Sequence, residues 1–178
     1  MPIRTTRITT WQESAEALRA IRTAVFIREQ QIPAALEWDA DDEDAVHFLV
    51  RTDAGEHLAT ARLIFDTPSS ARAGRFAVLP AHRRQGVASG LLRFIIGFAR
   101  SQGVEDLHLS AQTAVRELYE KEGFTEVGPT YLEADIPHIH MSLHLRDRKQ
   151  SVSLHLGSDE RVHRFSAIED YRDHLRRI

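Results

Sequence analysis

The feature that most restricts how this chain can fold is a strand, a loop and a helix that follow one another directly. Residues 74–79 have the pattern of a strand, and residues 81–87 form a loop. A helix is expected to run from this loop to about Gln102, with Gly103 in the position that ends a helix. The chain therefore places a helix N-terminus beside the end of a strand.

The loop has the chemistry of an anion site. The pattern is Arg83-x-x-Gly86-x-Ala88, and Arg84 adds a second cation. A helix start leaves backbone N–H groups unpaired, and the helix dipole adds positive potential there, so a pyrophosphate suits the site. Gly86 lets the backbone approach a phosphate closely. By composition alone, the loop is equally well explained as an exposed arginine pair before an ordinary core helix, since short glycine motifs often occur without a phosphate site.

The other elements indicate one mixed sheet with helices packed on it. Thr10 and Glu13 have capping-box spacing, which predicts a helix to about Arg28, with Arg19 and Arg22 off its apolar face. The expected strands are 3–9, 46–52, 57–65, 74–79, 107–110, 124–127 and 139–145, with a further helix at 113–122 and an acidic loop at 31–45. This order predicts an α/β fold around a central sheet.

Composition excludes several classes of protein. The chain has no cysteine, so disulfides, thiolate–zinc sites and a cysteine nucleophile are ruled out. A net charge of −3 argues against a nucleic-acid partner, and the longest apolar stretch, 91–99, is interrupted by Arg93 and Gly97 and is too short to span a membrane. The N-terminus lacks an apolar signal segment. A soluble, cytoplasmic protein is expected.

Residues 147–178 have sequence patterns of their own. Val152, Leu154 and Leu156 alternate like a strand, and Ser166 with Glu169 opens a charged helical pattern. We expect a domain at 1–146 and an extension at 147–178, which is either a packed appendage or the start of a further domain.

Four segments carry a resemblance to a known family. GRFAVLPAHRRQGVASGLL resembles motif A of the GNAT superfamily of acyl-CoA N-acyltransferases, and AVRELYEKEGF resembles its motif B. VFIREQQIPAALEWDADDEDAVHF and IPHIHM are similar to the ElaA-like branch of the superfamily. The resemblance covers about residues 4–146. It implies a central, mostly antiparallel twisted sheet with a splayed strand pair and flanking helices.

The resemblance also implies a cofactor, acetyl-CoA, and the residues that hold it. Gln112 stands where the family often has an asparagine at the start of the motif B helix, and Arg84 is placed to meet the adenosine 3′-phosphate. The implied contacts are the backbone of Phe76, Ala77 and Val78 for the pantetheine arm, and the amides of Gln85, Gly86, Val87, Ala88 and Ser89, with Arg83 and Arg84, for the phosphates.

The reaction implied is direct attack of a primary amine on the thioester in a ternary complex. By its match to the motif B tyrosine, Tyr119 is the candidate general acid for the thiolate, because a phenol stays protonated at neutral pH. A half-buried helix aromatic is the simpler alternative. The oxyanion would be bound by a backbone N–H near Val78.

The sequence indicates the residues that bind the acceptor amine less clearly than those that bind the cofactor. Glu29, Glu37 and Asp39 are candidates to bind the amine, against the alternative of a solvated acidic loop. His138 is a further candidate, either as a proton relay or as a hydrogen-bonding group at the strand edge. No third ligand is in register with His138 and His140, so no metal is predicted. The general base stays open.

The functional prediction is an N-acetyltransferase for a small-molecule or protein amine. The alternative is a non-catalytic CoA-binding regulatory or structural module. No nucleic-acid or membrane partner is expected, and the oligomeric state is open, a homodimer being one possibility. The sequence does not identify the acceptor, because a fold does not fix a substrate.

Overall fold

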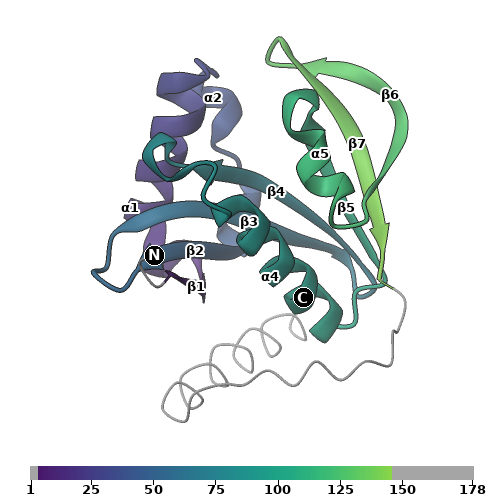
Figure 1. Ribbon diagram of the computed structural model, residues 1–178, viewed down its shortest axis with the longest axis horizontal. Coiled ribbons are helices and arrows are strands. Elements are labelled where there is room, and N and C mark those ends of the chain that lie inside the picture. The colour runs from purple at the N-terminus through teal and green to yellow at the C-terminus, as the bar shows by residue number, and fades with distance from the viewer. Residues whose placement is uncertain (1–3, 146–178) are drawn as a thin grey trace. The chain divides into compact units, whose positions relative to one another are not determined.

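The computed structural model describes residues 4–145, which form a seven-stranded sheet with helices on both of its faces (Figure 1). The strands are β1 (Arg4–Thr9), β2 (Val46–Thr52), β3 (His57–Thr67), β4 (Ser70–Val78), β5 (Asp106–Gln112), β6 (Thr125–Glu133) and β7 (Ile136–His144). The helices are α1 (Trp11–Arg22), η1 (Thr23–Glu29), α2 (Ala34–Glu37), α3 (Asp41–Asp44), η2 (Pro80–His82), α4 (Val87–Ser101), η3 (Thr113–Val115) and α5 (Arg116–Glu120). The domain boundary predicted at 146 and the extension at 147–178 lie outside the described residues.

The sheet is mixed, as predicted. Its strand order is β1-β2-β3-β4-β5-β7-β6, and β4 with β5 is the parallel pair among otherwise antiparallel neighbours in residues 4–145. The predicted helix at 113–122 is a 3-10 turn followed by the short α5, and the predicted loop at 31–45 contains α2 and α3. Within residues 4–145, none of the helices has the length and apolar character that a membrane crossing requires.

The first helix begins as its sequence predicts. The Thr10 side chain accepts a hydrogen bond from the Glu13 amide, and the Glu13 carboxylate accepts one from the Thr10 amide, which is a complete capping box. After Arg22 the helix continues as the π-helix η1 to Glu29. The helical segment therefore runs from Trp11 to Glu29, close to the predicted end at Arg28.

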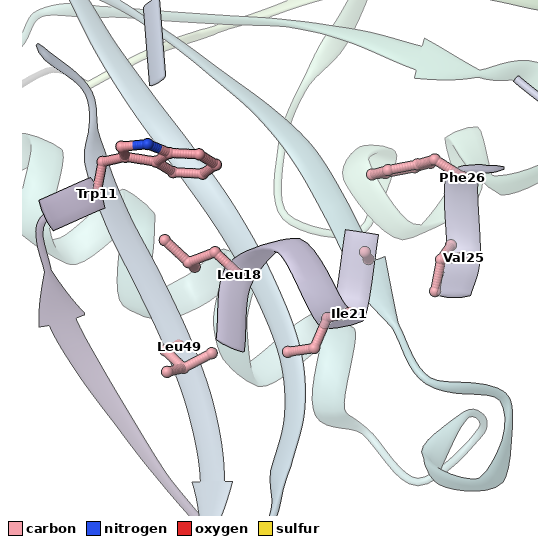
Figure 2. Packing of buried hydrophobic residues seen from close by; sticks show 7 residues of the cluster. Trp11, Leu18, Ile21, Val25, Phe26 and Leu49 are labelled. Carbon is pink, nitrogen blue, oxygen red and sulfur yellow. The ribbon is translucent and has the colours of Figure 1, made fainter. Parts of the chain in front are cut away.

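Two apolar layers cover opposite faces of the sheet. Leu49 of β2 packs in a cluster with Leu18 and Ile21 of α1 (Figure 2). Phe48, the residue before it, packs edge-on against Phe98 of α4, with ring centroids 5.5 Å apart. Successive strand residues point to opposite faces, so α1 and α4 lie on opposite sides of the sheet. We call these the α1 face and the α4 face.

The parallel pair β4–β5 separates part-way along its length. The two strands are paired from Ser70 to Ala73, and their register ends where Ala73 lies opposite Leu109. Immediately afterwards the pairing of β4 with β3 shifts, because β4 contains one extra residue between Gly74 and Ala77. Such a bulge bends its strand. The predicted splayed strand pair is therefore confirmed, and the bulge accounts for it.

The core predicts the effect of one substitution. Leu18 is completely buried in the α1 cluster, so Leu18→Ala should lower the free energy of unfolding by about 2–5 kcal/mol. Leu132→Ala, at a residue that is 68% exposed, should change it by less than about 0.5 kcal/mol. Urea denaturation of both variants measures the difference. Equal losses would contradict this assignment of the core.

Candidate active site

A cleft opens where β4 and β5 separate. Its volume is about 1140 Å³, which exceeds the usual volume of a pocket for one small ligand. Residues of β4, β5 and β7 line it, together with the loop before α4 and residues of η1, α2 and α5. The cleft therefore has room for an elongated ligand and a second molecule beside it.

The loop before α4 has the geometry of an anion site. Gly86 is the N-cap of α4 and has φ +76°, a left-handed conformation that glycine adopts without strain. No atom lies within 4 Å of the place where its Cβ would be, so the backbone there is open to the cleft. The first turn of α4, Val87 to Ser89, lines the cleft, and its amides lack intrahelical partners. Unpaired donors and the helix dipole thus favour a negatively charged group.

The two arginines of the loop have different surroundings. Arg83 donates to both carboxylate oxygens of Glu29, at 2.7 Å each, and its Nε donates to the Val78 carbonyl at 2.9 Å. The hydrogen bonds from Arg83 lower the pKa of the Glu29 carboxyl. Arg84 lines the cleft and has no hydrogen bond or ion pair with the rest of the described chain. Arg83 thus fixes the loop to η1, and Arg84 is the cation left for a ligand.

Tyr119 lies against the α4 face of the cleft. It is 5% exposed, and its ring packs edge-on against Phe76 of β4 and Phe124, with centroids 5.8 and 6.1 Å away. Burial raises the pKa of its hydroxyl far above the ordinary value. The phenol is therefore protonated throughout the physiological range, and its O–H is available as a hydrogen-bond donor to a group in the cleft.

The acidic loop forms ion pairs with buried arginines. Arg22 donates from Nε to Glu37 at 2.5 Å and from Nη1 to Asp42 at 2.6 Å, and all three side chains are at most 3% exposed. The prediction that Arg22 lies off the buried face of its helix is wrong. The cause is that two carboxylates compensate its burial, which an apolar periodicity does not register. Burial raises the pKa of Glu37, against the opposing effect of Arg22 and Arg75.

A second part of this network holds the β4 bulge. Arg75 has φ +53°, which costs a residue with a Cβ about 1–2 kcal/mol. Its Nη2 donates to Asp39 at 3.0 Å, and its Nε lies 3.3 Å from Glu37. Asp39 also accepts two hydrogen bonds from Arg62. Burial raises the pKa of Asp39, but the Arg62 contacts outweigh it and hold the pKa below its ordinary value. The strained bulge is thus fixed by charge pairs.

The α1 face of β5 and β7 is polar. Gln112 lies opposite His138, and Ser110 lies opposite His140. The Gln112 amide donates to the Gln30 side chain at 2.8 Å, which joins β5 to the end of η1. Ser110 Oγ is 3.0 Å from His140 Nδ1 and accepts from Tyr131 of β6 at 2.7 Å. Polar side chains of β5 and β7 therefore face the cleft on this side.

Most of the predicted site residues come together in the cleft. The structure places four elsewhere: Ala77 is buried under α1, and Gln85, Glu29 and Asp39 are held in contacts outside the lining. Those that line the cleft are Phe76, Val78, Arg83, Arg84, Gly86, Val87, Ala88, Ser89, Gln112, Tyr119, Glu37 and His138. The β4 backbone and the loop amides still reach the site.

Sequence reasoning missed the residues that shape the site. Arg75 and Arg62 both line the cleft, yet neither belongs to a motif. The surplus of acids in residues 37–44 was the available signal, because buried carboxylates such as Glu37 and Asp42 require cations and these arginines are on neighbouring strands. Tyr131 and Ser110 gave no signal, since their contact depends on strand register.

Comparisons with known proteins agree with this geometry. The chain matches the model of the acetyltransferase (GNAT) domain over residues 11–145. It is 30% identical to the uncharacterised N-acetyltransferase YjcF of Bacillus subtilis over 122 residues, 68% of this chain and 86% of that protein.

Solved structures give the same result. The crystal structure of Escherichia coli ElaA superposes with a TM-score of 0.70 at 28% identity, over 79% of this chain and 99% of that one. An acyl-CoA N-acyltransferase from Pseudomonas aeruginosa superposes with a TM-score of 0.69 at 31% identity, over 80% and 99%. The resemblance inferred from the four sequence segments is confirmed.

The buried network predicts a large effect of one substitution. Arg22→Ala leaves the carboxylates of Glu37 and Asp42 buried with less compensation, so the free energy of unfolding should fall by about 3–5 kcal/mol. The matched control is Arg7→Ala, which removes an exposed arginine 3.8 Å from Glu13 and should cost at most about 1 kcal/mol. Chemical denaturation at neutral pH compares them. A cost for Arg22→Ala no larger than that for Arg7→Ala would contradict the role of the network.

Proposed function

Because the chain belongs to the GNAT family of acyl-CoA N-acyltransferases, we propose that it transfers an acetyl group from acetyl-CoA to a primary amine by direct attack in a ternary complex. The observation that carries this proposal is the cleft between the separated strands β4 and β5, with a helix N-terminus at its rim. This arrangement can hold an anionic, elongated ligand and still admit a second substrate.

The residues at the rim fit the charged part of acetyl-CoA. The amides from Gly86 to Ser89 are donors for the pyrophosphate, and the absence of a Cβ at Gly86 leaves room for a close approach. Arg84 supplies a charge for a phosphate group, whereas Arg83 acts indirectly by holding the loop to Glu29. The β4 backbone from Phe76 to Val78 is the candidate partner of the pantetheine arm.

The chemistry requires a proton donor at the leaving group and a base at the amine. Bound acetyl-CoA supplies the acetyl group as a thioester, whose thiol the amine nitrogen displaces. Tyr119 Oη carries a proton that its burial retains, and it reaches the cleft beside Phe76. A raised pKa makes the phenol a weaker acid, but its O–H remains available to stabilise the leaving thiolate by a hydrogen bond. We therefore assign Tyr119 as the general acid, acting through this hydrogen bond to the sulfur.

The acceptor side of the cleft limits the amine only broadly. Asp39 and Glu37 are neutralised by arginines and act mainly to hold the bulge, so neither offers a free carboxylate to a cation. The polar surface with Ser110, Gln112 and His138 is the proposed contact for the acceptor. A small-molecule amine and an amine of a protein both fit this open side.

The loop assignment is tested with two glycine variants. Gly86→Glu should weaken acetyl-CoA binding by about 100-fold or more, roughly 2.8 kcal/mol, because a carboxylate would meet the pyrophosphate. Gly55→Glu is the control: Gly55 has φ +86° and open space around it, so its backbone cost is matched, but it lies in the β2–β3 turn. Titration calorimetry measures both affinities. An unchanged affinity in Gly86→Glu would overturn the assignment.

The role of Tyr119 is tested by removing only its hydroxyl. Tyr119→Phe keeps the ring contacts with Phe76 and Phe124, so folding and acetyl-CoA affinity should not change. The turnover number should fall by about 100-fold, as for the loss of a general acid. Steady-state kinetics with the amine that gives the highest rate provides the measurement. Full turnover in this variant would leave Tyr119 as a packing residue only.

A further inference from the structure

His138 is a buried histidine whose tautomer is set by its surroundings. It is 9% exposed, and its Nδ1 lies 2.7 Å from the backbone carbonyl oxygen of Ile136. A carbonyl oxygen only accepts hydrogen bonds, so Nδ1 must carry the hydrogen. In the neutral ring, Nε2 then has a free lone pair. The imidazole is thus prepared to accept a proton at one defined atom.

The free nitrogen of His138 has no protein partner in residues 4–145 and is not fully enclosed. His138 lines the cleft, and within residues 4–145 its Nε2 makes no hydrogen bond. Nor is this atom among the fully enclosed polar atoms that lack a partner. A nearly buried side chain that lines a cleft and keeps one accessible, unpaired nitrogen is an arrangement for interaction with a ligand.

The position of His138 along the sheet also fits a catalytic role. It pairs with Gln112, the last residue of β5, beyond the point where β4 and β5 separate at Ala73. Gln112 leads directly through η3 into α5, which carries Tyr119. By strand alternation, His138 is on the α1 face and Phe76 with Tyr119 on the α4 face. The two groups thus enter one cleft from opposite faces.

Glu37, His140 and His108, which also line the cleft, are less suited to the role of a base. The Glu37 carboxylate is paired with Arg22 and Arg75. His140 is exposed, and its Nδ1 contacts a serine hydroxyl, which can donate or accept, so its tautomer is not fixed. His108 lies in the closed part of the parallel pair, opposite Arg72.

We propose that His138 is the general base that removes a proton from the ammonium group of the acceptor, an inference that rests on the proposed acyl transfer. An N–H bond of the ammonium breaks, its electron pair stays on nitrogen, and the proton bonds to Nε2 of His138. The charged imidazole keeps its Nδ1–H bond to the Ile136 carbonyl and then releases the proton to solvent. The residue returns to its neutral form in each turnover.

The polar and titratable groups around His138 come from several elements. Tyr131 of β6 pairs with it and stacks on its ring at 5.9 Å. His140 is two residues along the same strand, Glu133 lines the cleft from β6, and β5 presents the neutral Gln112. Glu37 faces the cleft from α2 but is paired with arginines.

The first test measures the tautomer without any substrate. Long-range nitrogen–proton correlation spectra of the full chain, with His138→Gln used to assign the signals, should show Nδ1 protonated and Nε2 bare in the neutral ring. A neutral ring with its hydrogen on Nε2 would overturn the proposal.

The second test uses the pH dependence of kcat/KM. The base must be neutral to accept a proton from the ammonium group, so kcat/KM of the wild type should fall at low pH, where the imidazole is protonated and the acceptor is already in its ammonium form. His138→Gln should lower kcat/KM by about 100-fold or more at neutral pH. It should also remove the fall of kcat/KM at low pH. Affinity for acetyl-CoA should not change, since the residue contacts the acceptor side.

His144→Gln is the matched control. His144 is on the same strand and the same face but outside the cleft, where it contacts Asp106 at 2.7 Å. This variant should keep the wild-type rate and profile. The assignment of the base would be overturned if His138→Gln left the pH dependence of kcat/KM unaltered. It would also be overturned if His140→Gln, instead, removed the fall of kcat/KM at low pH. A wild-type chain that binds no acetyl-CoA and acetylates no amine would instead overturn the proposed function, and the spectra of His138 separate the two failures.

Discussion

The separation of β4 from β5 is the constraint on which the rest of the structure depends. The two strands are paired only as far as Ala73, and one extra residue in β4 then bends it away from its parallel neighbour. The bend places Arg75 in a strained conformation that ion pairs to Glu37 and Asp39 offset. Because the cleft exists only where the sheet opens, this buried charge network shapes the site without carrying out its chemistry.

The two faces of the sheet provide different groups to the cleft. On the α4 face, the first turn of α4 offers amides to an anion, and Tyr119 is kept protonated by burial. On the α1 face, the polar residues of β5 and β7 are open to a second substrate. Asp39 and Asp42 of the acidic loop do not give this side a free negative charge, since they pair with arginines of α1, β3 and β4.

The sequence predicted the parts of the protein that depend on local pattern. The capping box at Thr10, the hairpin β2–β3, and Gly86 at the start of α4 are encoded within a few neighbouring residues, and all are present. The charge network could not be predicted, because Arg22 and Arg62 reach their carboxylates only after the sheet assembles. The tautomer of His138 depends on a backbone contact two residues away, which no residue pattern indicates.

Titration of the purified chain with acetyl-CoA in a calorimeter tests the central claim most directly, with CoA and dephospho-CoA as comparisons. We expect acetyl-CoA and CoA to bind in the micromolar range, about −8 kcal/mol at 1 µM, and dephospho-CoA to bind more weakly because Arg84 loses a phosphate partner. A folded chain that binds none of the three would contradict the account, because the cleft between β4 and β5 would then not be an acyl-CoA site.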